Sequence, residues 1–138
     1  MEIIRPMSLA PRILVIMPDQ WTRALLRAAL RETGYDAIGA RDMEDAARYR
    51  AIEPGRGPVN LVLVDQDATA TGMDALRDIL SSHHDPPTVL VAHATHAPAD
   101  GPWSRVVRRP LSVADLVAVV ESELPLPTEG RHPVDPVT

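Results

Sequence analysis

Val59-Asn60-Leu61-Val62-Leu63-Val64-Asp65 is the stretch that decides the fold of this 138-residue chain. Its apolar residues are mostly branched and do not alternate regularly with polar ones, which is typical of a strand buried on both faces of a parallel sheet. A second run of this kind, Ile13 to Met17, ends at Pro18, and a third spans Thr88 to Ala92. These runs predict strands at 13–17, 59–64 and 88–92 in a sheet that helices cover on both faces.

Helical patterns separate these runs. They predict helices over residues 20–33, 42–52, 73–82 and from Ser112 to Leu124, with shorter strands at 36–40 and 105–108. The expected end signals are Asp19 and Ser112 as N-caps, a capping box at Asp42 and Asp45, and a C-terminal stop at Gly34. Strands that alternate with helices predict a five-stranded parallel sheet with right-handed crossovers.

The amino-acid composition excludes several kinds of site and reaction. The chain has no cysteine, and all 14 of its basic residues are arginine. These absences exclude disulfides, cysteine-based metal sites and any mechanism that needs a thiol or a side-chain amine. The net charge of -5 argues against a nucleic-acid partner, because a duplex binder needs a basic face.

Location and domain organisation follow from the apolar runs and the prolines. No run approaches the roughly 18 apolar residues of a membrane span, and the start does not read as an export signal, so we expect a cytoplasmic protein without a membrane partner. One domain is expected over residues 12–124. Residues 1–11 are expected to be a flexible leader, and residues 125–138, with four prolines, a disordered tail.

Functional residues of such sheets lie beyond the carboxyl ends of the strands. Those positions are Met17-Pro18-Asp19, Asp65 and its loop, Ala92-His93-Ala94 and Arg108-Arg109-Pro110. With Gly72-Met73-Asp74 and a capped last helix, this order resembles the receiver domain of two-component response regulators over residues 12–124. The resemblance implies a flavodoxin-like α/β fold. The interval from Ala92 to Arg109 is short for the family's fourth helix, which we expect to be truncated or irregular.

The resemblance implies that Asp65 stands at the phospho-accepting aspartate, but the other positions of that site differ. The acid pair that holds magnesium matches Met17 and Pro18, and neither offers an oxygen side chain to the ion. The family's lysine matches Arg109, whose planar fork is no substitute for a compact ammonium. The threonine or serine that contacts the phosphoryl group matches Ala92, which has no hydroxyl.

Asp65 therefore has competing interpretations. We expect it to be bonded to nearby amides or paired with Arg109. In the alternative, Asp19 and Asp67 converge with Asp65 on a cation. A metal at His93 and His96 is less favoured, because that segment does not read as a helix.

A structural role is the first expectation for two histidines and one tryptophan. His83 and His84 are expected to end a helix in solvent. Trp103 is expected to cover the edge that the missing helix leaves, or else to form a contact surface.

The leading prediction is a pseudo-receiver: a stand-alone signalling module that has lost magnesium-dependent aspartyl phosphorylation. It would need no cofactor and would act through a protein partner or a homodimer. One alternative is a regulator that is phosphorylated at Asp65 with Asp19 or Asp67 as substitute ligands. Another is a small-molecule sensor with an apolar pocket around Met17, Pro18 and Ala92. An enzyme is least favoured, because no nucleophile–base pair or phosphate loop stands out.

Overall fold

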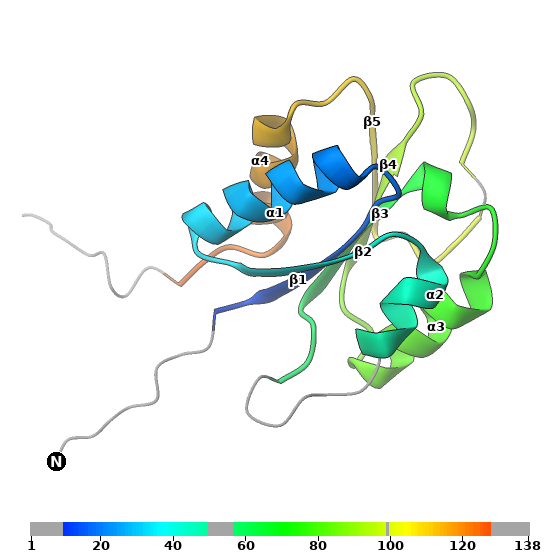
Figure 1. The fold of residues 1–138 in the computed structure, drawn as a ribbon, viewed down its shortest axis with the longest axis horizontal. Helices are drawn as coiled ribbons and strands as arrows, with labels where there is room; N and C mark the ends of the chain where they lie inside the picture. Colours follow the sequence, from blue (N-terminus) through cyan, green and yellow to red (C-terminus); the bar gives the residue numbers. More distant parts are fainter. Residues whose placement is uncertain (1–9, 50–56, 99, 128–138) are drawn as a thin grey trace, which may run out of the picture.

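A computed structural model of the chain describes residues 10–49, 57–98 and 100–127. One parallel sheet runs through them in the order β2-β1-β3-β4-β5 (Figure 1). Its strands are β1 (Arg12–Ile16), β2 (Asp36–Ala40), β3 (Leu61–Asp65), β4 (Thr88–Ala92) and β5 (Arg105–Arg108). The helices are α1 (Gln20–Thr33), α2 (Met43–Ala46), α3 (Met73–Ser82) and α4 (Val113–Glu123), with 3-10 turns η1 (Ala47–Tyr49) and η2 (Gln66–Ala68). The predicted flavodoxin-like α/β class is confirmed.

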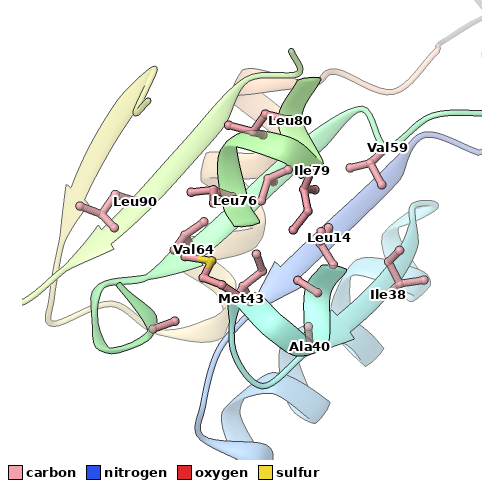
Figure 2. Close-up of a cluster of buried hydrophobic side chains, with 14 of the residues drawn as sticks. Leu14, Ile38, Ala40, Met43, Val59, Val64, Leu76, Ile79, Leu80 and Leu90 are labelled. Carbon is pink, nitrogen blue, oxygen red and sulfur yellow. The ribbon is translucent and has the colours of Figure 1, made fainter. Parts of the chain in front are cut away.

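Helices cover both faces of the sheet. α1 and α4 pack together on one face, and α2 packs with α3 on the other. Figure 2 shows the cluster under α2 and α3, which includes Leu14, Val64 and Leu90. The opposite cluster includes Ile13 and Leu63. Successive side chains of a strand point to opposite faces of the sheet, and helices cover both faces here. Every residue of β1, β3 and β4 is therefore buried, which explains their continuous apolar runs.

Residues at the ends of the helices explain why several observed bounds agree with those predicted from the sequence. The Asp19 carboxylate accepts the N–H of Thr22 at 2.9 Å, and Gly34 ends α1 with φ at 124°. Ser112 and Asp115 form the expected capping box at α4. α1, β2, α3 and β4 have the predicted bounds.

Several local predictions are wrong. β1 runs over Arg12–Ile16, so it begins and ends one residue earlier than the predicted strand at 13–17. The helix expected over 42–52 is an α-helix only over Met43–Ala46, followed by η1, and residues 50–52 lie outside the described residues. Asp45 does not complete a capping box with Asp42, because its carboxylate accepts the N–H of Arg41 at 2.9 Å. β3 begins at Leu61, two residues late, and the Val59 N–H donates to the His83 ring.

The segment between β4 and β5 contains no helix in its described residues, 93–98 and 100–104, as the short interval predicts. Trp103 packs against the cluster under α2 and α3. A Cβ added to Gly101 would lie 2.6 Å from the Trp103 ring, so the ring rests against that glycine. The indole therefore covers part of the sheet where a helix is missing, although Val106 of β5 stays 40% exposed.

The two predicted terminal segments fall mostly on residues 1–9 and 128–138, which lie outside the described residues. Before residue 128, Leu126 packs against the cluster under α1 and α4. Within the parts that the structure describes, no helix is both long enough and apolar enough to span a membrane.

Candidate functional site

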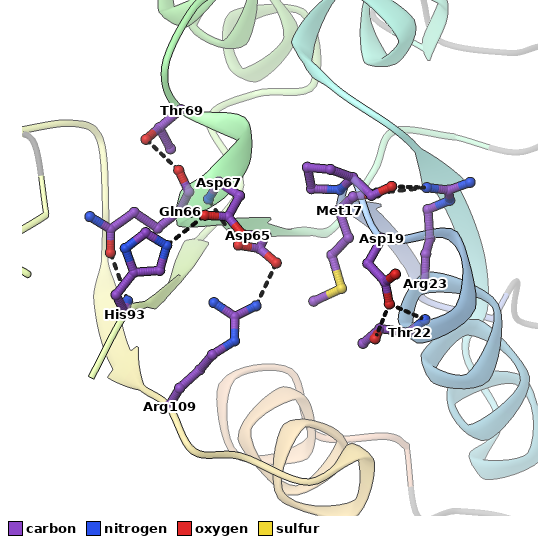
Figure 3. Close-up of polar contacts among 11 residues, drawn as sticks. Met17, Asp19, Thr22, Arg23, Asp65, Gln66, Asp67, Thr69, His93 and Arg109 are labelled. Carbon is purple, nitrogen blue, oxygen red and sulfur yellow. Dashed lines mark hydrogen bonds and ion pairs between the residues drawn. The ribbon is translucent and has the colours of Figure 1, made fainter. Parts of the chain in front are cut away.

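The carboxyl ends of the strands bring Asp65 and Arg109 together at one edge of the sheet (Figure 3). Asp65 ends β3 and is only 3% exposed. Its Oδ2 accepts from Arg109 Nη2 at 2.5 Å, and its Oδ1 accepts the backbone N–H of Asp67 at 2.9 Å. Both carboxylate oxygens therefore have a donor from within the chain, and the charge is balanced by a charge-assisted hydrogen bond.

Arg109 follows β5 directly. Its backbone N–H donates to the Ala92 carbonyl at 3.0 Å, which continues the ladder between β4 and β5 by one residue. The peptide bond to Pro110 is cis. The arginine side chain is about one-third exposed, whereas that of Asp65 is buried. The pair therefore joins a buried carboxylate to a guanidinium cation that reaches it from the solvent side.

Apolar residues stand where the resemblance implies the acid pair and the hydroxyl residue, and their side chains lie in different surroundings. Met17 is buried in the cluster under α1 and α4, whereas Ala92 is buried in the cluster under α2 and α3. Pro18 is exposed. Because Met17 and Ala92 lie on opposite faces of the sheet, they do not line the single apolar pocket that the small-molecule alternative requires.

The Asp19 side chain caps the N-terminus of α1. Its carboxylate accepts from the hydroxyl and the backbone N–H of Thr22, and these hydrogen bonds lower the pKa of Asp19. In Figure 3 the Met17 side chain lies between Asp19 and Asp65. Across residues 10–49, 57–98 and 100–127, no group of three or more histidines and acids is arranged to hold a metal ion. The expected alternative, in which Asp19, Asp65 and Asp67 converge on a cation, is not what the structure brings together.

An outer set of contacts joins the loops that follow β3 and β4 to the last residue of β5. His93 Nε2 lies 2.6 Å from Asp67 Oδ1, and the His93 N–H donates to Gln66 Oε1 at 2.7 Å. Arg108 donates to the carbonyls of His93 and His96 at 3.0 and 3.2 Å. Asp67 and His93 are partly exposed, so this pair is more accessible to water than Asp65. The carboxyl edge thus has a buried carboxylate, that of Asp65, beneath a more exposed set of contacts.

The sequence places Arg108 and the loop after Asp65 at this edge, but it does not predict the contacts that Gln66 and Arg108 make with the backbone of His93. The available signal was their position, because each lies at the carboxyl end of a strand that meets the same edge. His93 and His96 do lie together, with ring centroids 5.6 Å apart, but His93 is directed to Asp67.

His83 contradicts the prediction that it ends a helix in solvent. It is 2% exposed, its Nδ1 accepts the Val59 N–H at 2.9 Å, and its Nε2 donates to the Tyr49 carbonyl. The ring therefore joins the end of α3 to η1 and to the segment just before β3. His84 alone is exposed, as expected.

Known proteins resemble this chain in fold and not in sequence. No family model matches the sequence. No curated protein matches it either.

Solved structures do match. A receiver domain protein from Methanospirillum hungatei is 18% identical with a TM-score of 0.67, covering 85% of this chain and 94% of its own. A Thermotoga maritima response regulator, solved in complex with Mg(2+)-BeF, is 24% identical with a TM-score of 0.62, covering 83% and 99%. A Rhodopirellula baltica structure described as an adenylate cyclase is 14% identical with a TM-score of 0.66, covering 84% and 88%.

The fold is therefore that of CheY-like response regulator receiver domains. At these identities the likeness concerns the fold alone, and the residues at the carboxyl edge must carry any functional argument.

Proposed function

We propose that this chain is a cytoplasmic receiver-like signalling module that has lost magnesium-dependent phosphorylation of Asp65. It acts by contacting other proteins and not by catalysis. One observation carries the proposal: both oxygens of the Asp65 carboxylate are held by donors of the chain itself, Arg109 and the Asp67 N–H.

The chemistry of phosphoryl transfer supports this interpretation. An aspartate that accepts a phosphoryl group needs one free oxygen and a cation to offset the negative charge on both reactants. Magnesium takes oxygen ligands, and Met17 and Pro18 supply no such side chain where the resemblance implies the acid pair. Arg109 balances the Asp65 charge in place of a metal ion.

The proposal is tested by incubating the purified chain with magnesium and acetyl phosphate and measuring its intact mass. We expect no added phosphate. A stoichiometric phosphate on Asp65, lost in Asp65→Asn, would overturn the proposal and favour the phosphorylated alternative.

A restored variant makes the negative result informative. Pro18→Asp combined with Arg109→Lys returns one acid and the lysine to the positions that the resemblance implies. We expect this variant to bind magnesium more tightly than the unmodified chain and to gain phosphate at Asp65. Circular dichroism of both chains checks that the fold is retained. If the restored variant also stays unmodified while folded, Arg109 and Pro18 are not what prevents the reaction.

A further inference from the structure

The segment that follows β4 lies outside the apolar core. Residues 93–98, which we name the strap, are all exposed or partly exposed, and none of them belongs to either apolar cluster. The chain on each side is anchored, because every residue of β4 is buried and Trp103 packs against the cluster under α2 and α3. The strap is therefore a part of the carboxyl edge that apolar contacts leave free to move.

Hydrogen bonds hold the strap to η2 and to the end of β5. Gln66 Oε1 accepts the His93 N–H at 2.7 Å, and Gln66 Nε2 donates to the Ala97 carbonyl at 3.4 Å. Arg108 Nη1 donates to the carbonyls of His93 and His96 at 3.0 and 3.2 Å. Water can replace each of these partners, so the bonds add little net stability and the strap can open without unfolding the sheet.

One further contact joins two side chains that can carry opposite charges (Figure 3). His93 Nε2 lies 2.6 Å from Asp67 Oδ1, and both side chains are partly exposed, at 34% and 59%. An ionised carboxylate only accepts hydrogen bonds, so Nε2 carries the hydrogen. The Asp67 N–H in turn donates to Asp65 at 2.9 Å, so this contact connects the strap to the buried carboxylate.

We propose that the strap opens and closes against the carboxyl edge, and that the Asp67–His93 contact is a latch that is tighter when His93 is protonated. The closed strap occupies the side chains of Gln66, Asp67 and Arg108. The open strap leaves them free to bind a partner at the edge where parallel sheets carry their functional residues, so the closed state is autoinhibitory. Because it operates whether or not Asp65 accepts a phosphoryl group, the latch is distinct from the proposed function.

The charge of the His93 ring decides how firmly the latch holds. A protonated imidazole donates a charge-assisted hydrogen bond to a carboxylate, which is stronger than the bond from a neutral ring. Histidine gains and loses this charge between about pH 5 and 8. We therefore expect the strap to be more closed at about pH 5.5 and more open at about pH 8.

The test follows the motion of the strap in the full chain. The chain contains no cysteine, so one introduced cysteine carries a nitroxide label at a known position. Ala97→Cys places the label on an exposed side chain of the strap. Electron paramagnetic resonance, in buffer with EDTA to exclude metal ions, should show its correlation time shortening at least about twofold from about pH 5.5 to about pH 8. The same label at the exposed position of Ala118→Cys on α4 is the control and should not change.

Variants at the same edge assign the pH dependence to the latch. Further charged or titratable residues at this edge are Asp65, Asp67, His96, Arg108 and Arg109. Asp65 and Arg109 pair with each other, so the variants address the other three. His93→Gln and Asp67→Asn each remove the charged latch, and the label should then be mobile at both pH values. His96→Gln leaves the latch in place and should retain the pH dependence.

Two arginine variants separate the latch from the other contacts of the strap. Arg108→Gln removes two hydrogen bonds to the strap but not the latch, so the label should become more mobile at both pH values and keep its pH dependence. Arg31→Gln is the matched control, because Arg31 and Arg27 also donate to a backbone carbonyl, that of Ala37 in β2, at 3.0 and 3.4 Å. It should leave the label unchanged. Thermal unfolding of all variants shows whether the fold is retained.

Three outcomes would overturn the inference. The mobility at residue 97 does not depend on pH, or His93→Gln keeps the pH dependence, or the label at residue 118 loosens to the same extent because the whole domain responds. Phosphorylation of Asp65 is measured by intact mass on the unlabelled chain, so failure of the latch and failure of the proposed function are distinguishable.

Discussion

The two ends of the sheet contain the same pair of residue types in opposite settings. At the amino end, Arg12 Nε donates to Asp36 Oδ2 at 3.1 Å, and the arginine side chain is buried at 4% exposure. At the carboxyl end, Arg109 pairs with Asp65, and here the acid is buried while the arginine is 34% exposed. The amino-end cation is enclosed by the protein, whereas the carboxyl-end cation stays in contact with water.

The histidines repeat this difference. His83 at the amino end is buried with both ring nitrogens bonded, whereas His93 at the carboxyl end is partly exposed and meets Asp67. Buried polar groups are costly to leave unbonded, while exposed ones exchange partners with water at little cost. We therefore expect the amino end to contribute more to the stability of the fold, and the carboxyl end to rearrange without unfolding the domain.

His83→Ala should have the largest effect. It removes the acceptor of the buried Val59 N–H and leaves a cavity under α3, so we expect a loss of about 3 kcal/mol in the free energy of unfolding. Urea denaturation measures it. His84→Ala, at the exposed neighbour, is the control and should change stability by less than about 0.5 kcal/mol. A small effect at His83 would mean that the amino end is no more rigid than the carboxyl end.

Arg12→Met should rank second, with a loss of about 2 kcal/mol, because it removes the charged donor to Asp36 and to the Gly57 carbonyl from a buried position. The same measurement on Arg48→Met gives the matched control. Arg48 pairs with Asp45 at 2.9 Å but is 65% exposed, so its loss should cost about 0.5 kcal/mol or less. Equal costs at the two arginines would contradict the role given to burial.

Arg109→Met should cost less than Arg12→Met, about 1 kcal/mol, because water can reach the Asp65 carboxylate from the side that the arginine vacates. The double variant Asp65→Asn with Arg109→Met should recover part of this loss, since it removes the uncompensated charge. A cost at Arg109 larger than that at Arg12 would reverse the comparison between the two ends.

His93→Ala should have the smallest effect on stability, below about 0.5 kcal/mol, because its contact with Asp67 is exposed. Its effect should be seen in local motion instead. Amide hydrogen exchange should become faster in the loops after β3 and β4, which His93 joins, and should be unchanged at the start of β3. Global loss of protection would show that this outer layer holds the fold.

Much of the fold could be predicted because its signals are local. The bounds of α1 follow from Asp19 and Gly34, and the unbroken apolar runs of the central strands follow from burial on both faces. The helix that the sequence predicts after Asp42 is longer than α2, because the apolar pattern there does not show where the chain turns into η1.

The candidate site was less accessible to sequence reasoning. The Asp65–Arg109 pair could be anticipated from the resemblance, although its residues lie 44 positions apart. The burial of His83 could not, because its two partners lie 24 and 34 residues away and only the folded chain brings them together. The contact of His93 with Asp67 was missed for the same reason, across 26 residues.

The arginines that cap β2 also limit how the protein can assemble. β2 and β5 are the two edges of the sheet, and joining β5 of one molecule to β2 of the next would build an open-ended filament. Arg27 and Arg31 occupy the Ala37 carbonyl, so that head-to-tail addition meets a blocked edge in every copy. We therefore expect any association through strands to use β5 against β5, an arrangement that closes after two molecules and cannot grow into a fibre.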